Sequence, residues 1–195
     1  MSPRLVVAEK GCDSVKLIFS SSEKQSVTAI GAITADGRKL PLWVIAKGRT
    51  QRCLKKFGEH PNIQFHHTES GWTTESVMMR FLDAIHQDAG GCPCCLVLDL
   101  YPSHRTEAVI KRAEELDIEL IFVPAGLTSK LQPLDIRVFG ELKSRARAEF
   151  QRIAVHTGSR DIELHSSINI LIKCWERISP ENIIKAWGVI LHNTE

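Results

Sequence analysis

Residues 96–99 read Leu96-Val97-Leu98-Asp99, and residues 131–135 read Leu131-Gln132-Pro133-Leu134-Asp135. The first stretch is typical of a buried strand that ends in an acid. The second leads into a helix, because Pro133 suits a first turn in which its missing N–H would have no partner. Between them the apolar spacing predicts a helix over residues 106–117 and a strand over residues 118–123. This order of strand, helix and strand predicts a parallel pair with a right-handed crossover, in an α/β fold.

The two acids Asp99 and Asp135 are expected to meet in the folded protein. A carboxylate at the carboxyl end of a parallel strand lies where open α/β sheets bind ligands. A second carboxylate in the first turn of a helix can be aimed at the same crevice, and the helix N-terminus favours its ionised form. Two ionised carboxylates form a site for a hard divalent cation such as Mg²⁺, and hence for phosphoryl transfer. A third acid, which such sites usually have, is not evident from this pattern.

Length and composition indicate an ordinary globular protein. The chain has 195 residues, of which 43% are hydrophobic and 25% charged, so a single domain is expected. The formal charge of +2 and the pI near 8.2 are too mild to indicate nucleic-acid binding by themselves. No signal peptide opens the chain, and no apolar stretch approaches the roughly 18 residues of a membrane span. An intracellular protein without a membrane segment is therefore predicted.

The cysteines make a weak case for a zinc site. The cluster Cys92-Pro93-Cys94-Cys95 lacks the usual two-residue gap between ligands, and no second Cys/His pair lies at finger spacing. Cys95 is instead predicted to enter the strand as a small buried apolar residue, which is how free cysteine usually behaves.

The segment before this cluster predicts a hairpin and polar loops. Residues 27–33 and 40–46 are rich in β-forming residues and are joined by Asp36-Gly37, which is a strong hairpin signal. Residues 48–57 are interpreted as a basic surface loop, and a polar loop containing His60, His66 and His67 follows. Elsewhere, apolar spacing and capping residues predict short strands or loops over residues 4–8 and 15–19, and helices after Thr73 or Thr74 and over residues 162–177 and 180–192.

Three ordered stretches resemble a known family. They are residues 96–104, which end in Tyr101-Pro102-Ser103-His104, residues 121–135, and residues 138–143. Their order and spacing around the two acids are similar to the catalytic domain of pogo/Tigger-type transposases. These transposases belong to the mariner superfamily, and their domain is often called a DDE superfamily endonuclease. The similarity extends upstream through parts of residues 27–48 and 70–72, and downstream to residues 178–187.

The resemblance implies an RNase H-like mixed sheet flanked by helices over residues 1–155. Residues 156–195 would form a helical C-terminal extension of the same domain. In this family three acids hold two Mg²⁺ or Mn²⁺ ions, and DNA is nicked and joined by in-line displacement. Asp99 and Asp135 match the second and third acids, so both are expected to be catalytic metal ligands.

Two departures from the family pattern bear on activity. The first acid of the family lies in an Asp-Glu-Thr-Gly-like segment on the central strand, and this sequence contains no such segment. The central N-terminal strand and the first acid are therefore expected to be missing. Glu9 and Asp13 are nearby acids, but they align with the segment that follows that strand. Leu100 also stands where the family commonly has Asn or Gly.

The resemblance implies DNA as the partner and the nucleus as the location, with no membrane and no small-molecule substrate. A second copy of the chain, in a homodimer, is an open alternative to a monomer. One hypothesis is a metal-dependent DNA endonuclease and strand transferase; the alternative is a non-catalytic, domesticated DNA-binding or chromatin protein derived from a transposase. Whether the chain is an enzyme stays open at this point. Contact with DNA phosphates and plain solvation are equally open for the basic residues of segment 47–56 and for Arg137, Lys143, Arg145, Arg147 and Arg152.

Overall fold

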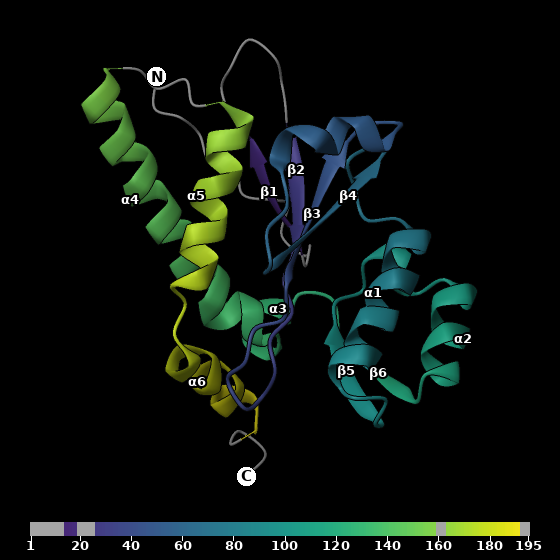
Figure 1. Ribbon diagram of the computed structural model, residues 1–195. Coiled ribbons are helices and arrows are strands. Elements are labelled where there is room, and N and C mark those ends of the chain that lie inside the picture. Colours follow the sequence, from purple (N-terminus) through teal and green to yellow (C-terminus); the bar gives the residue numbers. More distant parts are fainter. Residues whose placement is uncertain (1–13, 19–25, 159–162, 192–195) are drawn as a thin grey trace.

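Two separate sheets organise the protein, as the computed structural model shows for residues 14–18, 26–158 and 163–191 (Figure 1). The first sheet contains, in spatial order, β1 (Ser14–Ile18), β2 (Ser26–Ile30), β3 (Leu42–Lys47) and β4 (Ile63–Thr68). The second pairs β5 (Cys94–Leu98) with β6 (Ile118–Phe122). The helices are α1 (Glu75–Asp88), α2 (Glu107–Glu115), α3 (Thr128–Leu131), α4 (Phe139–Thr157), α5 (Leu164–Glu176) and α6 (Pro180–Leu191). The strand or loop expected at residues 4–8 and the acids Glu9 and Asp13 lie outside the described residues.

The predicted hairpin is confirmed. β2 and β3 pair antiparallel, and a bridge between Ile33 and Lys39 continues the pairing toward the turn. Gly37 in this turn has a φ of 94°, a conformation that favours glycine. The parallel pairing of β5 with β6, with α2 between them in the chain, is confirmed as well. A mixed α/β fold therefore follows from these local patterns.

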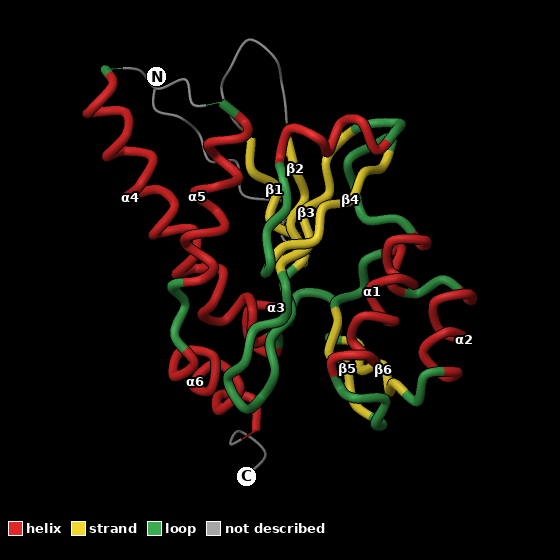
Figure 2. The backbone as a smooth tube through the Cα atoms, viewed as in Figure 1, coloured by secondary structure: helices red, strands yellow, loops and turns green. Residues whose placement is uncertain are grey.

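Helices cover both faces of the first sheet (Figure 2). Successive side chains of a strand point to opposite faces, so Leu42 and Val44 enter one core while Trp43 and Ile45 enter the other. The first core is completed by residues of α4, α5 and α6. The second is completed by α1 and α2, and it also includes Leu98 of β5. The second sheet is thus attached to the first mainly through the apolar side of α1.

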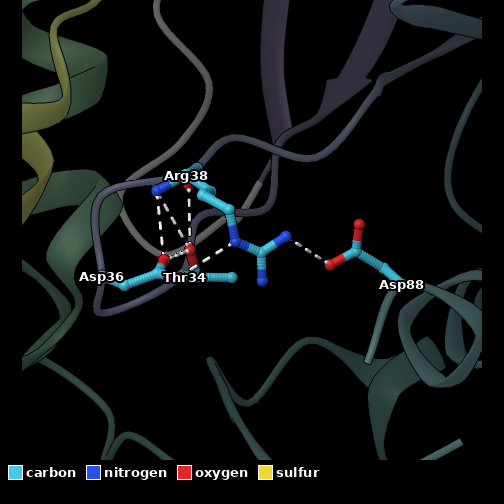
Figure 3. Close-up of polar contacts among 4 residues, drawn as sticks. All are labelled: Thr34, Asp36, Arg38 and Asp88. Atoms are coloured by element: carbon cyan, nitrogen blue, oxygen red, sulfur yellow. Dashed lines mark hydrogen bonds and ion pairs between the residues drawn. The ribbon is translucent and has the colours of Figure 1, made fainter. Parts of the chain in front are cut away.

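The hairpin turn is fastened to α1 by an ion-pair network (Figure 3). The Arg38 guanidinium contacts Asp36 within the turn at 3.1 Å and reaches Asp88 at the end of α1, also at 3.1 Å. The Thr34 hydroxyl donates a hydrogen bond to Asp36. Because these groups are largely exposed and the pairs are screened by solvent, each pair contributes little to stability.

Lys39 holds the carboxyl end of α5. Its ammonium group donates hydrogen bonds to three backbone carbonyls, those of Trp175 (2.9 Å), Glu176 (2.8 Å) and Ile178 (2.7 Å). The last carbonyls of a helix have no partner within the helix, so a cation at this position satisfies them and also complements the helix dipole. Burial lowers the pKa of Lys39, while the charges of Glu176 and Glu141 oppose this.

Three expectations about individual segments are wrong. The basic loop expected over residues 48–57 contains a 3-10 helix, η1 (Gln51–Phe57). The polar loop predicted around His66 and His67 is instead strand β4, because its backbone pairs in parallel with all six residues of β3. Cys95 is exposed rather than buried, because in the described structure β5 has a strand neighbour on one side only, β6. The part of the chain that the structure describes contains no helix long and apolar enough to cross a membrane.

The stability of this fold is expected to fall when the pH is lowered from about 6.5 to about 4, because of His66. Its ring stacks on Trp43 with centroids 4.0 Å apart. Burial, aided by the charges of Arg80 and His67, lowers the pKa of His66 to about 4. The folded state then binds fewer protons than the unfolded state between that value and the ordinary 6.5, so stability is lost as the pH falls. Urea unfolding at several pH values measures the effect.

The control for this prediction is His66→Phe, which keeps an aromatic ring against Trp43 and cannot titrate. Its free energy of unfolding should depend less steeply on pH over the same range. Equal pH dependence in the two proteins would show that His66 is not the group responsible.

Candidate metal centre

Asp99 is a buried carboxylate that directly follows β5. It is 1% exposed, and its Oδ1 accepts a hydrogen bond from the backbone N–H of Tyr101 at 2.9 Å. His104 Nδ1 lies 3.0 Å from the same oxygen, and this ring is itself buried in the short 3-10 turn Pro102–His104. The chain therefore turns back immediately after the strand and fixes the carboxylate from two sides.

Asp135 lies in a wide helical turn rather than an ordinary helix start. Residues Leu134–Val138 form a π-helical turn that runs directly into α4. The backbone N–H groups of Asp135 and Ile136 both donate to the carbonyl of Gln132, at 3.0 Å. This hydrogen bonding agrees with the helix-starting role expected for this segment. Short π-helical turns often occur at functional sites because they displace a side chain from the regular helical path.

The end of β5 and the π-helical turn converge on one small cavity of about 70 Å³. Leu98, which precedes Asp99, and Leu134, which precedes Asp135, both line it. His104 lines it too. Asp99 and Asp135 are not themselves in the lining, but each directly follows a residue that is, and the charge of Asp99 acts on Asp135.

The electrostatics of Asp135 agree with this placement. Its pKa is raised first by burial and then by the charge of Asp99, whereas the charge of Lys143 opposes the rise. The sequence suggested that a helix N-terminus would favour ionised Asp135. Burial and repulsion from Asp99 act in the opposite direction and raise the pKa of Asp135. A site in which burial and a like charge both disfavour the anion is one that a cation would stabilise.

Gln132, whose position in the sequence allows either support of the acids or a plain role at the helix start, adds a buried amide oxygen beside this site. The residue is 2% exposed and lines the cavity, and its Oε1 has no hydrogen-bond partner among the described residues. A buried amide oxygen without a partner is unfavourable by about 1–3 kcal/mol, so it is expected to meet a ligand. The signal in the sequence was a polar side chain set between Leu131 and Pro133-Leu134.

The donor set suits one divalent cation. Mg²⁺ is usually held by one or two carboxylates, with waters and substrate phosphates completing its coordination, and amide oxygens are also suitable ligands. Asp99, Asp135 and the Gln132 oxygen match that pattern. A cluster of three or more His, Cys, Asp or Glu ligands is absent among residues 14–18, 26–158 and 163–191. The predicted pair is thus brought together without a third acid in the described structure.

A longer apolar groove adjoins the cavity. It has a volume of about 640 Å³ and runs between the segment after β2, which includes Ala32 and Ile33, and strand β5. Trp187 of α6 lines both spaces, and its Nε1 is buried without a hydrogen-bond partner in the described structure. Cys95 of β5 lines both spaces as well. The groove and the cavity therefore share part of their lining, along β5 and the segment after β2.

Comparison with known proteins gives consistent relatives. A human protein described as "Pogo transposable element with KRAB domain" is 28% identical over 196 residues, which cover 94% of this chain and 32% of that protein. The mouse "Tigger transposable element-derived protein 4" is 24% identical over 165 residues, covering 82% of this chain and 31% of that protein. The chain thus spans about a third of the length of these curated relatives.

The fold also matches solved structures of Mos1 mariner transposase. Its catalytic domain superposes with a TM-score of 0.56 at 14% identity, covering 92% of this chain and 75% of that one. A Mos1 paired-end complex with the left transposon end gives a TM-score of 0.56 at 12% identity, and a paired-end complex with Mn gives 0.57 at 13%. Each covers 89% of this chain and 43% of the Mos1 chain.

These likenesses agree with the match to a family model. The model described as "DDE superfamily endonuclease" covers residues 23–187, which include both carboxylates and most of the described structure. The relatives are proteins derived from pogo and Tigger transposable elements, and the fold is that of the Mos1 catalytic domain. This chain therefore belongs to the DDE superfamily endonuclease family.

Proposed function

We propose that this chain is a transposase-derived DNA-binding domain in which Asp99 and Asp135 hold a divalent cation against a DNA phosphate, for metal-dependent strand cleavage and transfer. The observation that carries the proposal is the convergence of the end of β5 and the π-helical turn on one cavity. The cavity is lined by Leu98 and Leu134, the residues before the two acids, and by Gln132, whose Oε1 has no partner among the described residues. Charges of this sign and oxygens of this kind favour a hard cation.

The cation proposed is Mg²⁺ or Mn²⁺. A bound cation of this kind polarises a phosphoryl oxygen and lowers the pKa of coordinated water. Asp99 and Asp135 would hold it, and Gln132, whose Oε1 has no partner among the described residues, lines the neighbouring cavity. His104 and the Tyr101 N–H fix Asp99 in place, which keeps its carboxylate oriented without a further change of rotamer. Mos1 has been solved with Mn, which supports this choice.

DNA is proposed as the partner, and the nucleus as the location. Support comes from the Mos1 complex with a transposon end and from relatives derived from transposable elements. The chain covers about a third of the length of those relatives. The activity of any larger protein that contains this chain is therefore proposed as well. The chain is proposed to act either as a monomer or as a homodimer.

The finer fold proposed is RNase H-like, with room for a further strand in the groove beside β5. Strand β5 is apolar, yet among the described residues it pairs with β6 alone. Parallel sheets normally bury their strands on both sides, so a two-stranded parallel sheet with an open edge is unusual. A strand in the groove would meet that open edge and bring its end close to Asp99. A third carboxylate at that end would complete the family's set of acids.

A second function, DNA binding without catalysis, is favoured by one feature of the site. Two acids, not three, meet in the described structure, and Asp99 is almost completely enclosed. Such a chain would retain the scaffold and its DNA surface but would not cut DNA.

One assay tests both functions. Supercoiled plasmid is incubated with the chain and Mg²⁺ or Mn²⁺, and nicking is compared with that by Asp135→Ala, while binding of a labelled duplex is measured over a range of salt concentrations. Nicking by the unmodified chain but not by Asp135→Ala supports the endonuclease. Salt-dependent binding with no nicking by either protein supports the non-catalytic alternative. A chain that does not bind DNA at all contradicts both.

A further inference from the structure

A hollow of about 440 Å³ lies between α4 and α5, the two helices that run side by side in Figure 1. Helix α4 presents residues at positions 145, 148, 149 and 152, which share one helical face, and α5 and its carboxyl end present positions 173, 174 and 177. The lining of this α4–α5 basic pocket is Arg145, Ala148, Glu149, Arg152, Lys173, Cys174 and Arg177.

The charges of the pocket are unbalanced. Its lining contains four cations and one acid. Arg152 pairs with Glu149 at 2.6 Å within the lining, and Arg145 pairs with Glu141 at 2.7 Å, just outside it. Lys173 and Arg177 form no ion pair with any described residue. Neither of these two cations therefore has an ion-pair partner of its own in the described structure.

The positive side chains of the pocket also affect the pKa values of its acid, Glu149, and its thiol, Cys174. The pKa of Glu149 is lowered by its hydrogen bond with Arg152, and the charges of Arg177 and Lys173 act in the same direction. Burial raises the pKa of the Cys174 thiol at the pocket, and Arg177 and Arg145 oppose that rise. Side chains from both helices thus converge on a shared space.

An ordinary explanation for Lys173 and Arg177 is that they offset the dipole at the carboxyl end of α5. That end already has a cation, because Lys39 donates to three of its carbonyls. The two α5 side chains line the hollow instead, and both are exposed and able to meet a ligand.

We propose that the α4–α5 basic pocket binds a phosphodiester group of a nucleic-acid backbone. Guanidinium groups match phosphate geometry with paired donors, and a lysine ammonium adds a mobile charge. The inference rests on the proposed function, since it names a surface of this chain for the same DNA. It differs from the carboxylate site in residues and in charge.

The position of the pocket along α4 is suitable for a duplex that also reaches the acids. Arg145 and Arg152 follow Asp135 by about 15 Å and about 25 Å along the helix, from the usual rise per residue. At about 3.4 Å per base pair, this corresponds to roughly four to seven base pairs of duplex. A backbone phosphate at the pocket would therefore help to fix the register of DNA at the carboxylate site.

The first test compares two double variants that each remove two positive charges. Lys173→Gln with Arg177→Gln alters the pocket, and Lys111→Gln with Lys185→Gln alters exposed residues on α2 and α6. Binding of a short labelled DNA duplex is followed by fluorescence anisotropy over a range of salt concentrations, after circular dichroism has shown that each protein is folded. The pocket variant should bind about tenfold more weakly, and its salt slope should fall by about 1 to 2. Equal binding by the two variants overturns the proposal and leaves the carboxylate site unaffected.

A second variant should change the affinity for the DNA duplex in the opposite direction. Glu149→Gln removes the acid of the lining, so duplex binding should become several-fold tighter at low salt. A residue with a merely structural role would not produce a gain. Unchanged or weaker binding by a folded Glu149→Gln protein overturns the proposal.

Competition distinguishes the sources of the anion. Inorganic phosphate at matched ionic strength should displace the duplex poorly, because a backbone contact is one of several. Complete displacement by inorganic phosphate would assign the pocket to a small phosphate ligand and would overturn the proposal. Binding of polyglutamate by the Lys173→Gln, Arg177→Gln variant is measured as well. If this variant loses more affinity for polyglutamate than for DNA, the pocket is assigned to an acidic protein, which also overturns the proposal. If the unmodified chain does not bind the duplex at all, the proposed function fails and this inference fails with it.

Discussion

Replacing Asp135 with asparagine is expected to change stability in opposite directions with and without a divalent cation. In metal-free protein, burial and the charge of Asp99 raise the pKa of Asp135 above its ordinary 3.8, so the ionised side chain destabilises the fold at neutral pH. Asp135 keeps its proton to a higher pH in the folded state than in the unfolded state. The free energy of unfolding therefore falls as the pH rises from the ordinary pKa of Asp135 to its raised pKa. Asp135→Asn removes this penalty, so the metal-free variant should be more stable than the unmodified chain.

Added Mn²⁺ should reverse the order. A cation bound only to the folded state at a hundredfold excess over its Kd raises the free energy of unfolding by about 2.7 kcal/mol. The unmodified chain should show this gain, and Asp135→Asn should lose most of it because one of two carboxylate ligands is gone. Denaturant unfolding with EDTA and with MnCl₂ measures both effects. Glu114→Gln, which removes an exposed acid on α2, is the matched control. An equal gain from Mn²⁺ in Asp135→Asn and the control would contradict the metal site.

Replacing Lys39 with methionine should destabilise the protein by about 2 kcal/mol or more. The change removes three charge-assisted hydrogen bonds to the carboxyl end of α5 and leaves partly buried carbonyls without a partner. Methionine keeps the length and the apolar stem of lysine, so packing losses are small. The loss should appear as a lower midpoint of urea unfolding with an unchanged m-value.

The controls for Lys39 separate its hydrogen bonds from its charge. Lys185→Met removes an exposed lysine from α6 and should change stability by no more than about 0.5 kcal/mol. Lys39→Arg keeps the charge and should recover part of the loss. If Lys39→Met and Lys185→Met unfold at the same urea concentration, the three contacts do not contribute to stability.

Several parts of the fold could be predicted because their signals are local. Asp36-Gly37 sets the hairpin since its backbone preferences match a tight turn, and the pair β5 and β6 follows from apolar strands on either side of a helix. Other parts depend on partners distant in sequence. The histidine-containing segment Ile63–Thr68 is a strand because β3 pairs with it, and no residue within the segment indicates that pairing.

The candidate site likewise has features that depend on local sequence and features that depend on distant partners. Asp99 and Asp135 are proposed as metal ligands from the sequence, since each stands at a recognisable end of an element. The raised pKa of Asp135 could not be predicted from the sequence, because it depends on burial and on Asp99. The unpartnered oxygen of Gln132 and the pocket between α4 and α5 were also out of reach, since both arise where separate elements pack together.

The sequence by itself determined the family, the α/β class and the two acids, because motif order, turn chemistry and apolar periodicity are properties of neighbouring residues. The tertiary structure alone decided that β5 pairs with β6 alone among the described residues and lines a groove, that Asp99 is enclosed by His104, and that cations from two helices share one pocket. The physical reason is that burial, charge interaction and unsatisfied hydrogen bonding depend on distances between residues far apart in the chain.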